Sequence, residues 1–577
     1  MPSQANDYLF ELPDKAIDDT RPVRVICAGA GFSGVCAAIR LPQRIPNLEL
    51  VVYEKNADVG GTWFENRYPG VACDIPSAAY QFTFASWSQW TELYSAGHEI
   101  QSYLQYVAKK YGAYRFIKTQ HQVSGATWDE EAGKWTVLVK DLATGKTITD
   151  TCDFFLSATG ILNDWHWPEI PGLKDFKGPV VHSADWDDSL DLAGKRIALI
   201  GGGSSGIQIL PTLQPTAAHI DHYNRSQMWI ALGGFAGEEA FKRNPTGGNS
   251  KYSAEELAAF QKDPDAYFKY RAYVEAMLNV VHRVTWSDSD LCKMSEKLFR
   301  DSMQEKLASK PEVFASMNPS YPPVCRRITP GPGYLEAICA PNVDFISDPI
   351  ARVTPTGLET KDGKLREVDV VITATGFDTS YLPRYPVVGR NGVSLEQVWA
   401  EPHYPEAYVS VWAESMPNYM MFLGPNGAPP SGSTILAIES QADYISQCIL
   451  KCAREGYRTM AVKHDALKAF SGYIDSYMPR TVYTKPCKSW FKRGKSEGRV
   501  VALFPGSANG YRKMLQNPRW EDFVFTSTED TKVNPFGWMG VTMTRGEMDE
   551  TDPTPYLRDI DFPPVIVEDE KEVVAAA

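Results

Sequence analysis

The chain has 577 residues, and a usual domain size of roughly 150 residues suggests about four folded units, which excludes a single small binding module. Its 58 Lys and Arg residues stand against 71 Asp and Glu, giving a net charge of −13. This charge argues against nucleic acid as a partner, because binding a phosphate backbone needs a basic surface. With 43% hydrophobic and 22% charged residues, the composition is typical of a folded protein with a substantial core.

The start of the chain and its cysteines bear on location and on metals. Residues 1–20 carry several acids and no apolar run of signal-peptide length, and no stretch reaches about 18 uninterrupted apolar residues. We therefore expect no membrane span and a cytoplasmic protein. The ten cysteines contain no CxxC spacing, so they indicate neither a disulfide framework nor a zinc site. We expect most of them to be small core residues, and no metal.

A glycine-rich loop near the N-terminus predicts a first dinucleotide-binding unit. The apolar run Val23–Ala28 predicts a buried strand, residues 35–41 predict a helix, and Gly29-Ala30-Gly31-Phe32-Ser33-Gly34 lies between them. In such a loop the first glycine permits a tight turn, the second lets backbone approach a pyrophosphate, and the third lets helix and strand pack closely. The helix N-terminus then faces the phosphates with its positive dipole end.

The same pattern returns in the middle of the chain. Arg196–Ile200 predicts a strand, residues 207–213 predict a helix, and the loop between them is Gly201-Gly202-Gly203-Ser204-Ser205-Gly206. The motif has meaning only between a strand and a helix, and both copies have that context. The sequence therefore predicts two dinucleotide sites.

The charge that follows each loop distinguishes the two dinucleotides. After the first loop comes Glu54, whose carboxylate can accept from ribose hydroxyls and would repel a 2′-phosphate, as expected for FAD or NAD. After the second comes Arg225-Ser226, with no acid and with a guanidinium that can hold a phosphate by two hydrogen bonds, which favours NADPH. The alternative is that both are only solvated charges at strand ends. Two dinucleotides in one chain imply electron transfer from nicotinamide to flavin. A disulfide reductase would also need a redox cysteine pair, and the sequence contains none.

The remaining segments complete an α/β fold with two Rossmann-like dinucleotide-binding domains, for FAD and NADPH, and a helical insertion. Ser253 and Glu256 form a capping box, and Leu291, Met294 and Leu298 have helical spacing. We predict an FAD domain in residues 1–165 and 377–545, an NADP domain in 166–229 and 333–376, a helical insertion in 230–332 and a loosely held acidic tail in 546–577.

The segment between the two glycine loops resembles the fingerprint FxGxxxHxxxW(P/D) of type I Baeyer–Villiger monooxygenases. It reads Phe176-Lys177-Gly178-Pro179-Val180-Val181-His182-Ser183-Ala184-Asp185-Trp186-Asp187. Other stretches resemble this family in the same order, from about residue 20 to about residue 510: Gly60-Gly61-Thr62-Trp63, Cys73-Asp74, Ala158-Thr159-Gly160 and Ala374-Thr375-Gly376-Phe377-Asp378.

The resemblance implies FAD in the first unit, NADPH in the second, and conversion of a small-molecule ketone with O2 into an ester or lactone through a C4a-peroxyflavin. That chemistry requires exclusion of water and stabilisation of an anion. Arg327 matches the family's catalytic arginine, and Asp74 matches the carboxylate that holds it. Arg326 matches a neighbouring cation, commonly lysine in the family, that contacts the NADP phosphate.

Two further residues carry roles by resemblance only. His182 matches a linker residue that couples movement of the nicotinamide domain to the flavin, although it could equally be a hydrogen-bonded core residue. Trp490 matches a tryptophan on a mobile loop near NADP and substrate, but residues 492–498 depart from the family pattern. We count both with Arg327 and Asp74 as candidate catalytic residues.

The expected cofactor-binding residues are taken from both loops and from the family motifs. They are Gly29, Gly31, Phe32, Ser33, Gly34, Glu54, Lys55, Gly61, Thr62, Trp63, Asp74, Tyr80, Val123, Gly201, Gly203, Ser204, Ser205, Gly206, Gln208, Arg225, Ser226, Arg326, Thr375 and Gly376.

Two other functions stay open. A heteroatom-oxidising flavin monooxygenase shares both loops, but Trp186 followed by Asp187 argues against it. A non-catalytic NADP sensor has no need of Asp74 and Arg327. The sequence does not identify the ketone or the oligomeric state: Trp412 and residues 419–422 could line an apolar pocket, but such a stripe is more often a core strand.

Overall fold

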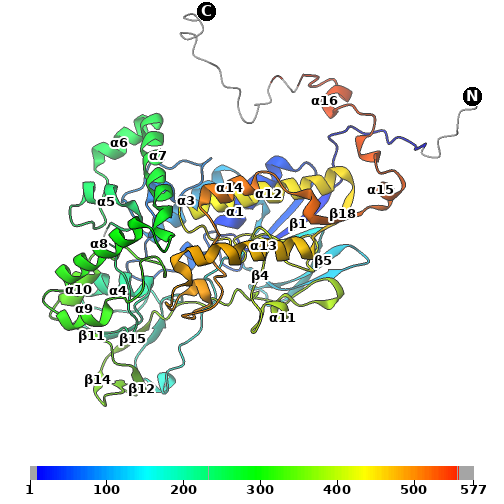
Figure 1. The fold of residues 1–577 in the computed structure, drawn as a ribbon. Coiled ribbons are helices and arrows are strands. Elements are labelled where there is room, and N and C mark those ends of the chain that lie inside the picture. Colours follow the sequence, from blue (N-terminus) through cyan, green and yellow to red (C-terminus); the bar gives the residue numbers. More distant parts are fainter. Residues whose placement is uncertain (1–8, 232, 555–556, 558–577) are drawn as a thin grey trace, which may run out of the picture.

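The computed structural model describes residues 9–231, 233–554 and 557, and is built around two parallel sheets (Figure 1). The first has the strand order β17-β7-β1-β2-β3, with every neighbouring pair parallel. Its strands are β1 (Val23–Ala28), β2 (Leu48–Tyr53), β3 (Ile117–Lys118), β7 (Phe154–Ser157) and β17 (Tyr419–Met421). The strand β17 comes from the C-terminal third of the chain. All strands of the second sheet therefore lie, in the sequence, between the other strands of this sheet and β17.

The second parallel sheet has the order β11-β10-β9-β15-β8. Its strands are β8 (Val180–His182), β9 (Arg196–Ile200), β10 (His219–Tyr223), β11 (Val343–Ile346) and β15 (Val370–Thr373). Each glycine loop leaves the central strand of its sheet, β1 or β9, where the strand order reverses direction. Ligands of open α/β sheets bind at such a switch point, outside the carboxyl ends of the strands.

Smaller sheets flank these two. One has the order β16-β4-β5-β6 and another β12-β13-β14, while β18 pairs with β19. The strands are β4 (His121–Asp129), β5 (Lys134–Asp141), β6 (Thr147–Cys152), β12 (Ile350–Thr354), β13 (Gly357–Thr360), β14 (Leu365–Glu367), β16 (Val387–Val388), β18 (Tyr457–Val462) and β19 (Phe523–Ser527).

Helices cover the first sheet and form the insertion. Helix α1 (Phe32–Arg44) packs against α12 (Thr434–Glu455), and α14 (Ala508–Leu515) lies beside them (Figure 1). Within the predicted insertion lie α5 (Glu238–Arg243), α6 (Ala254–Lys262), α7 (Pro264–Val280), α8 (Asp290–Lys306) and α9 (Pro311–Met317). The remaining helices are α2 (Thr62–Glu65), α3 (Gly97–Lys110), α4 (Ser204–Leu213), α10 (Tyr334–Cys339), α11 (Leu395–Trp399), α13 (His464–Tyr477), α15 (Glu529–Val533) and α16 (Arg545–Met548).

The helical patterns in the insertion are confirmed, but the apolar residues of one pattern face solvent and not the core. The capping box of Ser253 and Glu256 is present at the start of α6. In α8, Leu291, Met294 and Leu298 are all exposed, because this helix buries Cys292, Phe299 and Met303 instead. The domain boundaries stay predictions.

The two ends of the described chain lie together (Figure 1). The amide of Ile17 donates to the carbonyl of Met543, and the amide of Val541 donates to that of Lys15. The first residues of the predicted acidic tail belong to α16, while residues 555–556 and 558–577 of that tail lie outside the described residues.

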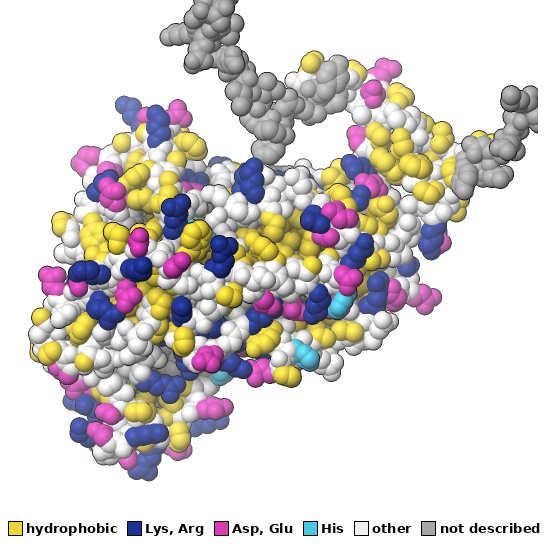
Figure 2. All heavy atoms as spheres, in the orientation of Figure 1, with side chains coloured by type: hydrophobic (Ala, Val, Ile, Leu, Met, Phe, Trp, Pro, Cys, Tyr) yellow, Lys and Arg dark blue, Asp and Glu magenta, His cyan; other side chains and the backbone are white. Residues whose placement is uncertain are grey.

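The surface charge bears on nucleic-acid binding, and the length and hydrophobicity of the helices bear on membrane insertion. On the face drawn in Figure 2, Lys and Arg side chains are interspersed with Asp and Glu and do not gather into one basic patch. No described helix combines the length with the apolar character that a bilayer crossing requires.

Candidate active site

The first glycine loop has the close approaches that its motif predicts. Gly29 has a φ of +101°, and a Cβ on it would lie 2.6 Å from the carbonyl oxygen of Ala158. A Cβ on Gly34 would lie 1.9 Å from the carbonyl oxygen of Gly29. Helix α1 begins at Phe32 with Gly31 as its N-cap and no capping side chain, so its first amides stay available to a phosphate.

This loop opens into a cleft of about 560 Å³, lined by strand ends of the first sheet and, from the second unit, by Ser204, Ser205 and Phe377. Many of the predicted cofactor residues line it: Gly29, Gly31, Phe32, Ser33, Glu54, Lys55, Gly61, Thr62, Trp63, Tyr80, Val123, Ser204 and Ser205. Residues 158–164 and Thr434, Ile435 and Ile438 of α12 are also part of the lining. A cleft lined by a glycine loop, by the carboxylate of Glu54 and by aromatic side chains fits FAD.

Glu54 is held in place at the end of β2. Its side chain is 3% exposed, and its two oxygens accept from the amides of Ala30 at 2.6 Å and Asn56 at 2.8 Å. Burial raises the pKa of Glu54 despite these hydrogen bonds. The carboxyl oxygens retain further lone pairs, to which a ribose hydroxyl could donate.

The second glycine loop repeats this geometry at β9. Gly201 has a φ of +117°, and a Cβ on it would lie 2.3 Å from the carbonyl oxygen of Ala374. A Cβ on Gly206 would lie 2.0 Å from the carbonyl oxygen of Gly201, whereas a Cβ on Gly203 would have no described heavy atom within 4 Å. The space at Gly203, beside the uncapped start of α4 at Ser204, fits a phosphate group.

Residues predicted to read the 2′-phosphate come together beyond β10. Arg225 is exposed, and the amide of Ser226 donates to the side chain of Asn224. Arg326 lies next to them, because its Nη1 donates to the carbonyl of Gln227 at 3.5 Å. Arg326, from a distant part of the sequence, therefore contacts the segment that carries Arg225, and two guanidinium groups on one segment would suit a dianionic phosphate.

Other predicted cofactor residues serve contacts within the chain. Gln208 does not line the cleft: its amide nitrogen donates to the carbonyl of Ala72 at 3.0 Å, and its oxygen accepts from the hydroxyl of Tyr68 at 2.8 Å. It links α4 to the segment that precedes Asp74. Asp74, Gly376 and Thr375 also lie outside the lining of the cleft.

Arg327 and Asp74 form a bidentate ion pair. Nε of Arg327 donates to one carboxylate oxygen of Asp74 at 2.9 Å, and Nη2 donates to the other at 2.7 Å. The Cζ atom of Arg327 lies 4.6 Å from the ring centroid of Phe235. Burial alone would lower the pKa of Arg327, but the Asp74 carboxylate outweighs it and the pKa is raised, so this side chain stays protonated.

The pair lies close to the lining of the cleft. Asp74 follows Cys73 directly. The pKa of Tyr80, which lines the cleft, is raised mainly by burial, then by the Cys73 thiol and by the charge of Asp74. Trp63 donates its indole N–H to the hydroxyl of Tyr80 at 3.3 Å. Arg327 and Asp74 both act electrostatically on Tyr80, so the positive charge of Arg327 stands beside the aromatic residues that line the cleft.

Known proteins with this arrangement identify the family. A family model described as flavin-binding monooxygenase-like matches residues 22–235. The FAD-binding monooxygenase tazF of Aspergillus terreus is 38% identical over 525 residues, 90% of this chain and 91% of that protein. The FAD-binding monooxygenase moxY of Dothistroma septosporum is 36% identical, over 93% of this chain and 85% of that protein. The chain belongs to the flavin-binding monooxygenases.

Solved structures confirm the fold class. Cyclohexanone monooxygenase from Rhodococcus sp. Phi1 bound to NADP+ superimposes on the chain with a TM-score of 0.75 and 25% identity, covering 88% of this chain and all of that one. An oxidized steroid monooxygenase bound to NADP superimposes with a TM-score of 0.74 at 24% identity, which bears on the fold alone. The predicted resemblance to Baeyer–Villiger monooxygenases and the two Rossmann-like domains are confirmed.

In this monooxygenase, His182 joins the two chain segments that connect the sheets. It ends β8 and is fully buried, and its Nδ1 accepts from the amide of Ala184 at 3.1 Å. Nε2 therefore carries the proton and donates to the hydroxyl of Thr375 at 3.3 Å. The imidazole stacks on Trp165 at 4.4 Å, and burial lowers its pKa to about 4. A neutral, fully bonded imidazole is suited to holding the segments and not to proton transfer.

The cysteines contradict one expectation. Cys325 and Cys487 form a disulfide with Cα atoms 6.5 Å apart, so the interpretation that no disulfide is present was wrong for this pair. The other eight cysteines are free, and all except half-buried Cys339 are buried, as predicted. The bond joins residues 162 positions apart and ties the segment that carries Arg327 to the one that carries Trp490. Sequence spacing could not reveal it, because the two cysteines meet only in the folded chain.

Trp490 lies in a cluster around this disulfide and does not line the cleft. Its ring meets that of Phe491 edge to face at 4.8 Å. The sequence after it, which departs from the family pattern, closes the loop on itself: Lys492 is 2% exposed and donates to the carbonyls of Lys485 at 2.7 Å and Ser496 at 2.6 Å. Sequence reasoning missed this lysine, because a run of basic residues usually faces solvent.

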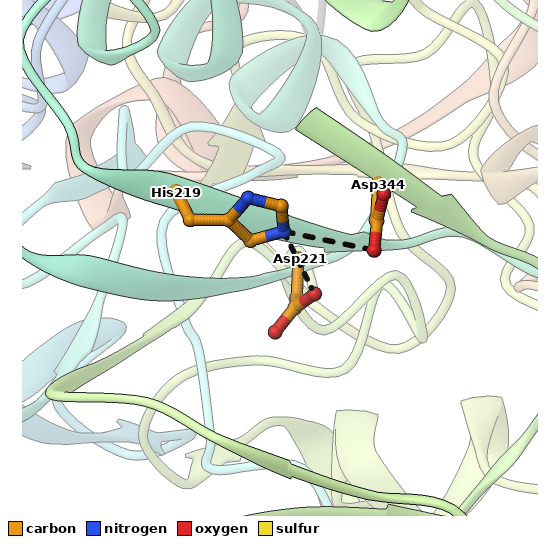
Figure 3. A group of neighbouring side chains, drawn as sticks. All are labelled: His219, Asp221 and Asp344. Carbon is orange, nitrogen blue, oxygen red and sulfur yellow. Dashed lines mark ion pairs between the residues drawn. The ribbon is translucent and has the colours of Figure 1, made fainter. Parts of the chain in front are cut away.

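Three residues of types that can ligate a metal ion, His219, Asp221 and Asp344, lie together at the edge of the second sheet (Figure 3). Nε2 of His219 lies 3.5 Å from Asp221 and 3.6 Å from Asp344. The guanidinium of Arg366 already donates to both carboxylates, at 3.2 Å and 2.8 Å. The carboxylates therefore have a cationic partner from within the chain, and the group is an ion-pair network.

The apolar stripe of the C-terminal part is a core strand. Trp412, Tyr419, Met420, Met421 and Phe422 are all buried, and residues 419–421 form β17 at the edge of the first sheet. None of them lines the cleft. The alternative interpretation of these residues as a core strand is confirmed.

Proposed function

We propose that this monooxygenase converts a ketone and O2 into an ester or lactone at the expense of NADPH, the Baeyer–Villiger reaction. FAD would lie in the cleft, along the first glycine loop and Glu54. NADPH would lie on the second loop, with Arg225 and Arg326 at its 2′-phosphate. When bound, NADPH supplies the electrons and FAD activates the oxygen.

One feature of Arg327 carries the proposal. Asp74 takes up Nε and Nη2, and Nη1 makes no hydrogen bond to any residue that the structure describes. A protonated guanidinium with one edge fixed and another free is an oriented donor for a negatively charged oxygen atom. Insertion of oxygen next to a ketone needs such a donor, since negative charge develops on the carbonyl oxygen during attack. Oxidation of a sulfide or amine does not.

The neighbouring residues support this role in two ways. Asp74 fixes the plane of the guanidinium through two hydrogen bonds, which keeps the donor aimed without reorganisation during the reaction. Trp63, Tyr80 and Phe32 form one aromatic cluster in the lining of the cleft, with the rings of Phe32 and Tyr80 5.2 Å apart. Such surface excludes water, which strengthens the electrostatic effect of Arg327.

The test compares Arg327→Ala with Arg390→Ala, which removes an arginine from a bidentate surface pair with Glu130. With a panel of cyclic, linear and steroid ketones, we expect the wild type and the control to form an ester or lactone. Arg327→Ala should retain FAD and be reduced by NADPH, yet form almost no ester. Normal ester formation by that variant would remove Arg327 from this role. Sulfoxide or N-oxide formation without any ester would instead favour heteroatom oxidation.

A further inference from the structure

We propose that Tyr94 is a positioning residue for Arg327: its hydroxyl holds the loop that places Phe235 against the guanidinium. The proposal deepens the role given to Arg327 above and rests on that role. Neither Tyr94 nor Phe235 belongs to a motif that the sequence analysis singled out.

The hydroxyl of Tyr94 makes two hydrogen bonds to one loop of the insertion. It donates to the carbonyl of Gly233 at 2.6 Å and accepts from the amide of Ala236 at 2.9 Å. The Tyr94 side chain is only 3% exposed, so water cannot replace either bond. The turn Gly234–Ala236 between these two bonded groups is thereby fixed from both ends.

This turn carries Phe235, the aromatic neighbour of Arg327. The Cζ atom of Arg327 lies 4.6 Å from the ring centroid, a distance at which a cation is attracted to the ring. The fit is close: Gly234 has a φ of +52°, and a Cβ on it would lie 2.5 Å from the Pro330 side chain and 2.8 Å from the Tyr94 hydroxyl. A side chain would therefore not fit at this position, and the turn packs closely between Pro330 and Tyr94.

The backbone around Tyr94 also touches the segment that carries Asp74. The amide of Cys73 donates to the carbonyl of Ser95 at 3.0 Å, and the amide of Ser77 donates to that of Leu93 at 2.8 Å. Residues 93–95 thus lie directly beside residues 73–77. One short segment is bonded to both groups that contact Arg327: through its backbone to the segment 73–77 that bears Asp74, and through the Tyr94 hydroxyl to the turn that bears Phe235.

Two contacts are needed to aim this guanidinium. The bidentate bond to Asp74 fixes one edge of Arg327, and the ring of Phe235 limits how far its plane can tilt about that edge. If the turn loosens, the Asp74 pair persists while the direction of the free Nη1 becomes variable. We expect a loss of efficient oxygen transfer without loss of either cofactor.

The test uses Tyr94→Phe, which removes only the hydroxyl, and Tyr252→Phe as its matched control. Tyr252 is also buried, and its hydroxyl bonds to that of Tyr270 at 3.0 Å, within the insertion, and not to the turn Gly234–Ala236. Hydrogen exchange on the purified protein should show the amide of Ala236 exchanging about tenfold faster in Tyr94→Phe, as expected when a buried amide loses its acceptor. The control should leave this amide unchanged.

The second readout is hydrogen peroxide: the rate of its release without ketone, where the electrons of NADPH end in peroxide in every variant, and its yield per NADPH oxidised with ketone. Tyr94→Phe should release about tenfold more peroxide than the control, while the rate of flavin reduction by NADPH stays within about twofold of the wild type. Phe235→Leu, which keeps the apolar contact but removes the ring, should reproduce the peroxide release with normal flavin reduction.

Two results would overturn the proposal. One is unchanged exchange at Ala236 in Tyr94→Phe, and the other is faster exchange with wild-type peroxide release in both variants. A wild-type enzyme that forms no ester from any ketone would contradict the proposed function instead. The exchange and the ketone-free peroxide measurement do not depend on that outcome, so the two failures can be told apart.

Discussion

Replacing Asp74 with asparagine tests how much the ion pair contributes to oxygen transfer. Asparagine has nearly the same shape, but its NH2 group would face a guanidinium N–H where a carboxylate oxygen now accepts at 2.7 or 2.9 Å. Breaking a fully buried pair costs about 3–5 kcal/mol, and an exposed pair contributes about 1 kcal/mol or less. The side chains of Arg327 and Asp74 are 34% and 22% exposed, which places this pair between the two cases.

We therefore expect Asp74→Asn to raise the activation free energy of ester formation by about 2–3 kcal/mol. Because each 1.36 kcal/mol changes a rate about tenfold, ester formation should fall about 30- to 150-fold. Stopped-flow absorbance should show FAD retained and flavin reduction by NADPH nearly unchanged, with the loss confined to turnover with ketone. The control is Glu130→Gln, which makes the same exchange in the surface pair with Arg390 and should change the rate less than about threefold. A wild-type rate of ester formation in Asp74→Asn would refute the reasoning that this carboxylate aims the guanidinium.

Two further predictions concern the NADPH side of the site and the disulfide. Arg225→Ala should weaken NADPH binding about 10- to 100-fold, because a charge-assisted hydrogen bond to phosphate is lost. NADH binding should change about twofold at most. Equal losses of affinity for both nucleotides, measured by titration, would refute the phosphate contact. Peptide mapping without reductant should recover Cys325 linked to Cys487, and Cys487→Ser should lower the free energy of unfolding by about 2–4 kcal/mol. Cys339→Ser, at a free half-buried cysteine, is the control, and a map that contains only free Cys325 and Cys487 would contradict the pairing.

The sequence was sufficient to predict the motifs whose function depends on local backbone geometry. Both glycine loops have the φ values and close approaches that their spacing predicts, and Glu54 lies at the end of its strand. Such features depend on a few consecutive residues between a strand and a helix, so local sequence contains all the information needed. The pair of Arg327 and Asp74, 253 positions apart, was reached only through resemblance to a family, because nothing in their local sequence links them.

The composition, the two loops and the order of motifs were sufficient to identify an α/β flavin-binding chain and to indicate where its dinucleotides bind. The disulfide of Cys325 and Cys487, the burial of Lys492 and the contact of Phe235 with Arg327 could not be obtained in this way. Each depends on segments that are far apart in the sequence or on a charged side chain that finds its acceptors only after the loop has closed. Tertiary packing determines these contacts. Their free energy depends on burial, and a side chain is buried only once the whole chain has folded.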